Sequence, residues 1–450
     1  MKALFITILF LFVFQTANAQ TNDEIIQTLR ERVEVGKTNQ SIVVATIDEK
    51  GTKFTSLGNI SQKPNAANTD ENTVFEIGSV TKVFTATLLA EAVKRGEIKF
   101  DDPISKYLPA TVKAPTRNGK EITLLDLVTH TSGLPRMPSN LAPKDGQNPY
   151  ADYTVEQMYD FLAKYELPRD IGSKAEYSNF GMGLLGHILS RRAGISYENL
   201  VKTRILLPLG LNDTTITLYP AQKNRMAQGY DINGEENSLW DLPTLAGAGA
   251  LRSTAKDMAK FAAYNLGLEK SSLLDVFNTA HQPQRDFNPQ MKIGLAWLTL
   301  QSKPDKEIVW HNGGTGGFVS FIGFIKSEKR AVVILSNSAQ SVDDIGLHIL
   351  DATSPLRKIK PFVAVGENLL DEYAGNYEFA NKAVFTITTE DGKLFAQLAN
   401  QPRIRVFAES ENKFYYRIVA AKLTFNRGAD GKIESLTLSQ NGEQIAKRIK

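Results

Sequence analysis

The stretch that decides the fold is Val74-Phe75-Glu76-Ile77-Gly78-Ser79-Val80-Thr81-Lys82, where a short apolar strand runs into an apolar helix. Apolar residues then recur every three or four positions until Gly96, which predicts a helix over Val80 to Arg95. Residues three apart on a helix are side-chain neighbours, so Ser79 and Lys82 are expected to point the same way. The strand, glycine and helix therefore predict a serine and a lysine held side by side at the mouth of a buried helix.

This pairing has a chemical meaning. A serine hydroxyl is a poor nucleophile until a base takes its proton. Lys82 can act as that base if burial or nearby cations lower the pKa of its amine from the ordinary value of about 10.4. The helix start also offers free amide donors and the positive end of its dipole, which favour the oxyanion of acyl transfer. The S-x-x-K spacing thus indicates a serine nucleophile, with a simple N-cap as the alternative reading of Ser79.

The S-x-x-K pattern occurs twice more, and context separates the copies. Ser253 with Lys256 precedes the periodic segment Thr254 to Asn265 and is predicted to be an ordinary helix N-cap. Ser410 with Lys413 lies in a strand-rich region, where residues three apart do not share a face. Both copies are therefore expected to be structural.

Strand and helix signals outward from this stretch predict an α+β domain. Strand patterns come first and last, and helical patterns fill the middle of the chain. The expected strands are Ser41 to Asp48, Lys53 to Leu57, Ile293 to Leu300, Phe318 to Ile325 and Ala331 to Ser336. The other expected helices are Val155 to Tyr165, Gly183 to Arg192, Tyr197 to Ile205, Thr254 to Asn265 and Val342 to Leu350. Strands at both ends suggest one mixed antiparallel sheet that carries a helical insertion.

The end of the chain has a different sequence pattern from the first domain. From Leu370 onward, about eight short alternating segments are separated by Asp391-Gly392, Asp430-Gly431 and Asn441-Gly442, which favour tight hairpin turns. Their number and length predict a small all-β, barrel-like domain, because closure removes exposed strand edges. The expected organisation is a first domain over residues 20–352, a linker over 353–366 and a β domain over 367–450.

Composition and charge narrow the function classes. The chain has 450 residues, of which 42% are hydrophobic, and its 52 basic and 49 acidic residues leave a net charge of only +3. No run of like charge stands out, so nucleic acid is not an expected partner. The chain has no cysteine, which excludes a disulfide framework, a thiolate nucleophile and a lipid anchor on cysteine.

The first nineteen residues read as a targeting segment. Lys2 is followed by the apolar run Ala3 to Phe14 and by small residues that end Ala17-Asn18-Ala19. This pattern predicts a secretory signal peptide over residues 1–19, cleaved before Gln20. The apolar run is shorter than the roughly 20 residues that span a bilayer, so no membrane span is expected after cleavage. A periplasmic or extracellular protein is the prediction.

Two later segments complete a set with Ser79 and Lys82. Tyr177-Ser178-Asn179 and His311-Asn312-Gly313-Gly314 follow in the order and rough spacing of the three motifs of the class C β-lactamase and penicillin-binding-protein family, which includes DD-peptidases. The chain resembles this family over about residues 25 to 350. Further similar segments are Leu127 to Pro135 and Ala246 to Ser253. The β-rich tail resembles the lipocalin-like domain appended to some of these hydrolases.

The resemblance implies roles for the matched residues. Ser79 would attack the carbonyl, Lys82 would help to remove its proton, and Tyr177 would share the base role and protonate the leaving group. Asn179 would bind the substrate amide and hold Lys82, while the amide of Gly314, next to Gly313, would form an oxyanion hole with that of Ser79. Which of Lys82 and Tyr177 takes the first proton stays open. The resemblance implies no cofactor and no metal ion.

The third motif departs from the lysine form of the family pattern, because His311 replaces the lysine. A histidine of ordinary pKa near 6.5 is mostly neutral at neutral pH and is a weaker receptor for a substrate carboxylate. Three hypotheses follow for a small-molecule or peptide substrate. The first is hydrolysis of a β-lactam or a D-Ala-D-Ala-like cell-wall amide through an acyl-serine; the second is an esterase or D-amino-acid peptidase; the third is a non-hydrolytic penicillin-binding sensor.

Overall fold

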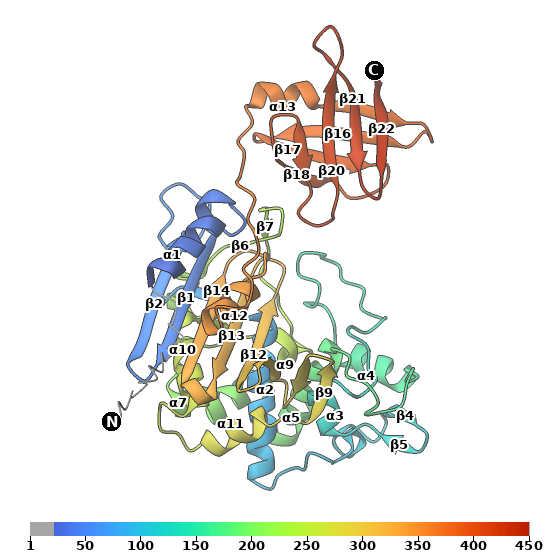
Figure 1. Cartoon of the computed structure of the whole chain (residues 1–450). Coiled ribbons are helices and arrows are strands. Elements are labelled where there is room, and N and C mark those ends of the chain that lie inside the picture. Colours follow the sequence, from blue (N-terminus) through green and yellow to red (C-terminus); the bar gives the residue numbers. More distant parts are fainter. Residues whose placement is uncertain (1–21, 450) are drawn as a thin grey trace, which may run out of the picture.

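The computed structural model describes residues 22–449, and the expected signal peptide at 1–19 lies outside them. The chain forms two separate bodies joined by an extended segment, a larger α+β domain and a smaller β domain (Figure 1). Within residues 22–449, no helix has the length and apolarity needed to cross a membrane.

An eight-stranded sheet forms the centre of the larger domain. All of its strand pairs are antiparallel. Its order is β2 (Gly51–Gly58), β1 (Ser41–Asp48), β14 (Arg330–Ser336), β13 (Val319–Ile325), β12 (Lys306–Gly314), β11 (Leu298–Lys303), β10 (Met291–Ile293) and β9 (Arg285–Asn288). Strands from the two ends of the domain are thus neighbours, as Ile42 opposite Ser336 shows. The predicted α+β class with strands at both ends and helices between them is confirmed.

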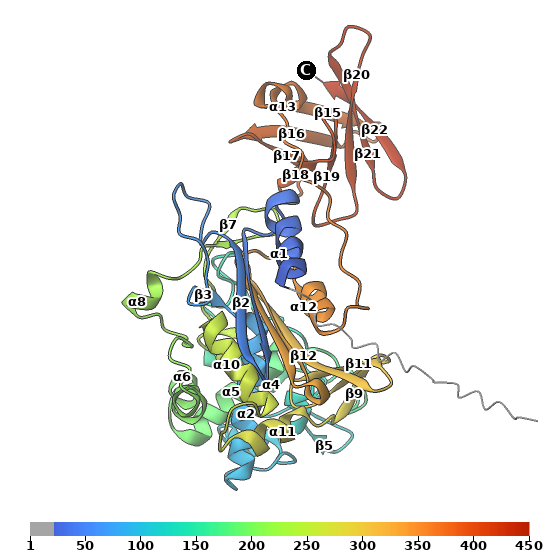
Figure 2. The ribbon, with the colours of Figure 1, turned by 60° about the vertical axis from the view of Figure 1, so that its left-hand side comes forward.

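Alternation along β1 places two cores on the two faces of this sheet. Ile42 and Val44 pack with α1 (Asn22–Arg30) and α12 (Asp343–Leu350) on one face. Val43 and Ala45 face the larger core, which the helical insertion supplies. Figure 2 shows α1 and α12 on one side of the strands and the insertion on the other.

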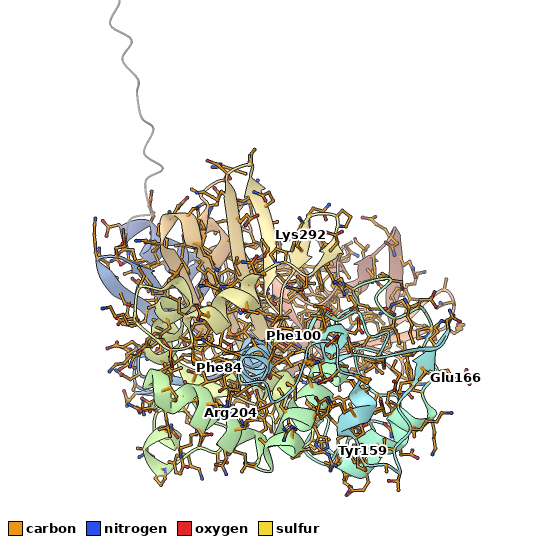
Figure 3. The ribbon with its side chains drawn as sticks, turned by 90° about the horizontal axis from the view of Figure 1, so that it is seen from below. Phe84, Phe100, Tyr159, Glu166, Arg204 and Lys292 are labelled. Carbon is orange, nitrogen blue, oxygen red and sulfur yellow. The ribbon has the colours of Figure 1, made fainter. Side chains whose placement is uncertain are left out.

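The insertion holds most of the helices. They are α2 (Thr81–Lys94), α3 (Leu124–Val128), α4 (Val155–Lys164), α5 (Asn179–Ala193), α6 (Tyr197–Val201), α7 (Leu207–Leu209), α8 (Pro220–Lys223), α9 (Ala246–Gly249), α10 (Ala255–Leu266) and α11 (Leu274–His281). Helix α2 is buried almost all round, and Phe84 on it stacks on Phe261 with ring centres 4.2 Å apart. Figure 3 shows α2 nearly end-on near the middle of the domain, beside the labelled Phe84.

Three predictions need correction. The segment Ile293 to Leu300 is not one strand, because Ala296 has φ +61° and the chain turns between β10 and β11. Ser253 is not an N-cap: it lies buried in β8 (Arg252–Thr254), with its hydroxyl 2.8 Å from that of Thr214, and the cap of α10 is Thr254. Helix α5 begins four residues before the expected Gly183, because Ser178 caps it through Gly181 N.

The smaller domain is a closed barrel, as predicted. Its strands follow chain order: β15 (Gly375–Phe379), β16 (Val384–Glu390), β17 (Lys393–Leu398), β18 (Ile404–Ala408), β19 (Lys413–Tyr415), β20 (Lys422–Arg427), β21 (Ile433–Ser439) and β22 (Glu443–Ile449), with α13 (Glu367–Tyr373) before them. Ser410 and Lys413 flank a turn in which Ser410 N donates to the Lys413 carbonyl. This copy of S-x-x-K is structural.

The barrel touches the larger domain through a few polar contacts. Lys393 forms an ion pair with Glu235, and Arg405 donates to the carbonyl of Asn233. Both partners lie in the hairpin of β6 (Gly229–Tyr230) and β7 (Glu236–Asn237). Arg417 donates to the carbonyls of Gly36 and Lys37. These contacts surround a cavity of about 600 Å³ that lies between the domains.

Candidate active site

Ser79 lies in a single 3₁₀ turn (Gly78–Val80) that leads from β3 (Val74–Glu76) into α2. Gly78 has φ +47°, and a Cβ there would lie 2.8 Å from both Gly314 N and Gly314 O. Only glycine combines this backbone conformation with so close an approach to β12. The Ser320 hydroxyl on β13 donates to the carbonyl of Ile77 at 2.8 Å, which anchors the turn to the sheet.

Lys82 projects from the first turn of α2 toward Ser79. Its Nζ lies 2.9 Å from Ser79 Oγ, 2.8 Å from Asn179 Oδ1 and 2.7 Å from the carbonyl oxygen of Ala248. The lysine is 0% exposed. Lys82 Nζ is therefore the point at which three segments meet: the turn that carries Ser79, the start of α5 and α9.

The surroundings of Lys82 favour its neutral form. Burial lowers the pKa of the Lys82 amine well below its usual value, and the nearby charge of Arg136 lowers it further. Three polar neighbours suit this state. Nζ donates to Asn179 Oδ1 and to the Ala248 carbonyl and lies within hydrogen-bond distance of Ser79 Oγ. Once the amine is neutral, its lone pair can accept the hydroxyl proton of Ser79. The geometry therefore gives Ser79 a base within hydrogen-bond reach.

Tyr177 lies beside this pair, just before α5. Its ring centre is 4.8 Å from Lys82 Nζ. Burial raises the pKa of the Tyr177 hydroxyl to about 12, although a hydrogen bond with Ser79 and the charge of Arg136 oppose this. Tyr177 is therefore a protonated phenol at neutral pH, and its hydroxyl is in hydrogen-bond contact with Ser79.

Two buried histidines pack around Tyr177. His130 lies with its ring centre 4.5 Å from that of Tyr177, and its Nδ1 accepts the Ser178 amide at 3.2 Å. His311, on β12, lies 6.4 Å from Tyr177 between ring centres and places Nδ1 2.6 Å from the carbonyl of Asn312. Burial, together with the charge of Lys82, lowers the pKa of His311 to about 3. Both imidazoles are therefore neutral at ordinary pH, since burial also lowers the pKa of His130 well below its usual value.

Gly313 lets β12 lie directly against the Ser79 turn. A Cβ at Gly313 would meet Ile77 O at 2.1 Å, Ser320 Oγ at 2.4 Å and Ser79 N at 3.0 Å. The next residue, Gly314, lies against Gly78 and is exposed. The backbone of the third motif thus lies beside the Ser79 amide, where an oxyanion hole requires its two donors.

Several site residues were not expected from the sequence. A small cavity of about 30 Å³ is lined by Ser79 and by apolar side chains from distant segments, among them Met137, Tyr150 and Trp240. Arg136, in the loop after α3, places its guanidinium carbon 5.2 Å from the centre of the Tyr177 ring. The Ala248 carbonyl was also missed, although its segment was recognised as similar to the family. The spacing of residues along the sequence does not reveal which side chains and carbonyls distant loops bring into the site.

The structure also accounts for residues outside the site. Tyr197-Glu198-Asn199 repeats the tyrosine and asparagine spacing of Tyr177-Ser178-Asn179. The Tyr197 hydroxyl lies 2.7 Å from that of Thr85, and Ser196 caps α6, so this second copy is structural. His187 contacts Tyr159 and His281 contacts Asn265, both as packed side chains. Within the described part of the chain, no group of three or more histidine and acidic side chains is placed to hold a metal ion.

Two protein-family models match this chain. A protein-family model described as Beta-lactamase matches residues 25–353, and one described as a domain of unknown function (DUF3471) matches residues 361–448. The D-alanyl-D-alanine-carboxypeptidase/endopeptidase AmpH of Escherichia coli (strain K12) is 30% identical over 357 residues, which cover 76% of this chain and 86% of AmpH.

Two further proteins extend this comparison. Penicillin-binding protein 4* of Bacillus subtilis (strain 168) is 26% identical over 417 residues, which cover 84% of this chain and 88% of that protein. The crystal structure of a beta-lactamase/D-alanine carboxypeptidase from Yersinia pestis, complexed with citrate, superposes with a TM-score of 0.63 at 25% identity. It covers 74% of this chain and 96% of the Yersinia chain.

Proposed function

Because this chain belongs to the beta-lactamase family and is a serine hydrolase, we propose that it cleaves β-lactam or D-alanyl-D-alanine-like amides through an acyl-enzyme on Ser79. The observation that carries the proposal is the buried Lys82 Nζ, 2.9 Å from Ser79 Oγ and held by Asn179 and Ala248. The names of the relatives supply the substrate class.

Acylation begins with Lys82. Its neutral amine takes the hydroxyl proton while Ser79 Oγ forms a bond to the carbonyl carbon of the amide. The carbonyl oxygen becomes an oxyanion that accepts hydrogen bonds from the amides of Ser79 and Gly314. The opposite pKa shifts of Lys82 and Tyr177 support Lys82 as the first base, because the lysine more readily reaches its neutral form.

Tyr177 acts in the second half of acylation. As the carbon–nitrogen bond breaks, the leaving nitrogen takes the phenol proton, and the Lys82 ammonium returns a proton to the phenolate. Water then attacks the acyl ester and transfers one proton to the Lys82 and Tyr177 pair. Ser79 leaves the carbonyl carbon as its oxygen regains a proton, which restores the starting site. The contacts of Tyr177 with Ser79 and Lys82 support this route.

A side-by-side substrate panel tests the proposal. A chromogenic cephalosporin, a D-Ala-D-Ala peptide and a short acyl ester are assayed with the wild-type protein and with Ser79→Ala. We expect multiple turnover of the cephalosporin or the peptide and loss of it in the variant. Intact-mass detection of a long-lived penicillin adduct without turnover would instead favour the sensor hypothesis. Turnover of the ester alone would contradict the proposed substrate class.

One observation favours the esterase or D-amino-acid peptidase as a second candidate. Neutral, buried His311 stands where the lysine form of the motif has a permanent cation. If no other group binds a substrate carboxylate, the site has no preference for carboxylated amides over uncharged esters. The relative kcat/KM values for the ester and the peptide in the same panel decide between the two.

We also propose that the protein works outside the cytoplasm, in the periplasm or beyond it. The basic residue, apolar run and Ala17-Asn18-Ala19 at the start of the chain support this location. It would place the enzyme next to cell-wall peptides. N-terminal sequencing of the exported protein tests the proposal, with Gln20 as the expected first residue; a retained Met1 in that protein would contradict cleavage.

A further inference from the structure

The proposed substrates carry a carboxylate close to the bond that is cleaved, and the family's usual cation for it is replaced here by His311. That imidazole is 1% exposed and neutral, so it offers no charge to an anion. Lys82 does not fill this need either. Its nitrogen already contacts Ser79, Asn179 and Ala248, and the lysine is needed as a neutral base.

Arg136 supplies a cation next to Tyr177. Its guanidinium carbon lies 5.2 Å from the centre of the Tyr177 ring, and its charge acts on Tyr177, Lys82 and His130. The residue is exposed. Among residues 22–449, its guanidinium has no ion-pair or hydrogen-bond partner, so its donors remain available to a ligand.

The backbone of Arg136 is fixed relative to the site. Its carbonyl accepts the amides of Asn179 and Phe180 at 3.0 and 3.2 Å, at the start of α5. The preceding residue, Pro135, accepts the Ser178 hydroxyl at 2.6 Å, and the following residue, Met137, lines the cavity beside Ser79. The loop backbone is therefore tied to the Tyr177-Ser178-Asn179 motif, and the exposed Arg136 side chain extends from this anchored backbone.

We propose that Arg136 receives the substrate carboxylate and thereby sets specificity for carboxylated amides. This inference rests on the proposed acyl-serine function. A guanidinium presents parallel N–H donors that match a carboxylate in a two-point contact. Because Arg136 lies on the Tyr177 side of Ser79, the carboxylate is held near the leaving nitrogen, where Tyr177 delivers its proton.

Two matched substrates test this assignment. One is an N-acylated D-Ala-D-Ala peptide with a free C-terminal carboxylate, and the other is the same peptide as its C-terminal amide. Both are assayed with wild type, Arg136→Gln and Arg136→Lys. Arg30→Gln is the control, because Arg30 is an exposed arginine at the end of α1, on the opposite face of the sheet.

Arg136→Gln is expected to lower kcat/KM for the free carboxylate by about 10- to 100-fold, the range of a charge-assisted hydrogen bond. The same change should alter kcat/KM for the amide by less than about threefold, and Arg136→Lys should recover part of the lost preference. The ratio between the substrates is the readout, because removal of Arg136 also raises the pKa of Lys82 and slows both reactions alike.

Equal losses on the two substrates, or an unchanged ratio, would overturn the role of Arg136 and leave the proposed function standing. If wild type neither turns over nor is acylated by either peptide or by a cephalosporin, the proposed function fails, and the Arg136 assignment falls with it. A misfolded Arg136→Gln protein would show a changed circular dichroism spectrum. Arg136→Lys, which keeps the charge and most of the side-chain length, then supplies the ratio.

Discussion

Replacement of Gly313 by alanine tests whether the close approach of β12 to the Ser79 turn matters for the chemistry. The added Cβ would lie 2.1 Å from the Ile77 carbonyl oxygen, 2.4 Å from Ser320 Oγ and 3.0 Å from Ser79 N. The first contact is about 1.4 Å short of the ~3.5 Å at which carbon contacts become favourable. Two of the three neighbours are backbone atoms that cannot rotate away, so β12 and the turn must move apart.

Two effects of different size are expected from Gly313→Ala. The free energy of unfolding should fall by about 1–3 kcal/mol, the usual cost of an inserted methyl group in a packed region. The acylation rate should fall by about 10²–10³-fold, the cost of losing one oxyanion donor, because the Gly314 amide moves away from that of Ser79. The chemical effect therefore exceeds what partial loss of folded protein can explain.

Urea unfolding measures the free energy of unfolding, and stopped-flow acylation with a chromogenic cephalosporin measures the acylation rate. Gly146→Ala is the matched control, because a Cβ at Gly146 has no atom within 4 Å. A Gly313→Ala protein that acylates within about threefold of wild type would refute the argument that this contact shapes the oxyanion hole.

Three further outcomes are expected. Lys82→Ala should lower kcat by at least ~10³-fold, since the members of an acylation unit act together, whereas Lys256→Ala of the second S-x-x-K should leave kcat unchanged. The pKa of His311 is lowered to about 3 in the folded protein, so the unfolded chain binds its proton first as pH falls below about 6.5. The free energy of unfolding should therefore decrease from pH 6.5 toward pH 3, by up to about 1.4 kcal/mol per pH unit from this group, and less steeply in His311→Gln. Glu235→Ala should loosen the barrel and speed proteolysis of the segment 353–366 with little change in kcat; a large drop in kcat would mean that the barrel takes part in the chemistry.

The sequence was most informative where chemistry depends on local spacing. The contact between Ser79 and Lys82 follows from the geometry of one helical turn, and alternation with turn dipeptides was enough to predict the barrel. The break after Ile293 was missed because Gly294 to Trp297 continue the apolar pattern of a strand, although the backbone turns there at Ala296. Pattern alone cannot distinguish a buried turn from a buried strand.

The remainder of the site depends on contacts between distant segments. Arg136 and Ala248 reach Tyr177 and Lys82 through loops whose course is set by tertiary packing. The state of His311 is a property of burial, which a single residue letter does not reveal. The roles of the matched residues stay predictions until the variants are measured.

The pairing of β1 with β14 has a consequence for how the protein is made. These strands come from opposite ends of the larger domain, with Ile42 opposite Ser336. During synthesis β1 has no partner on that side until almost the whole domain has emerged, and such long-range pairing slows folding. A fragment that stops before Arg330 would expose an apolar strand edge and is expected to aggregate, so a chaperone that shields β1 should raise the yield of active enzyme.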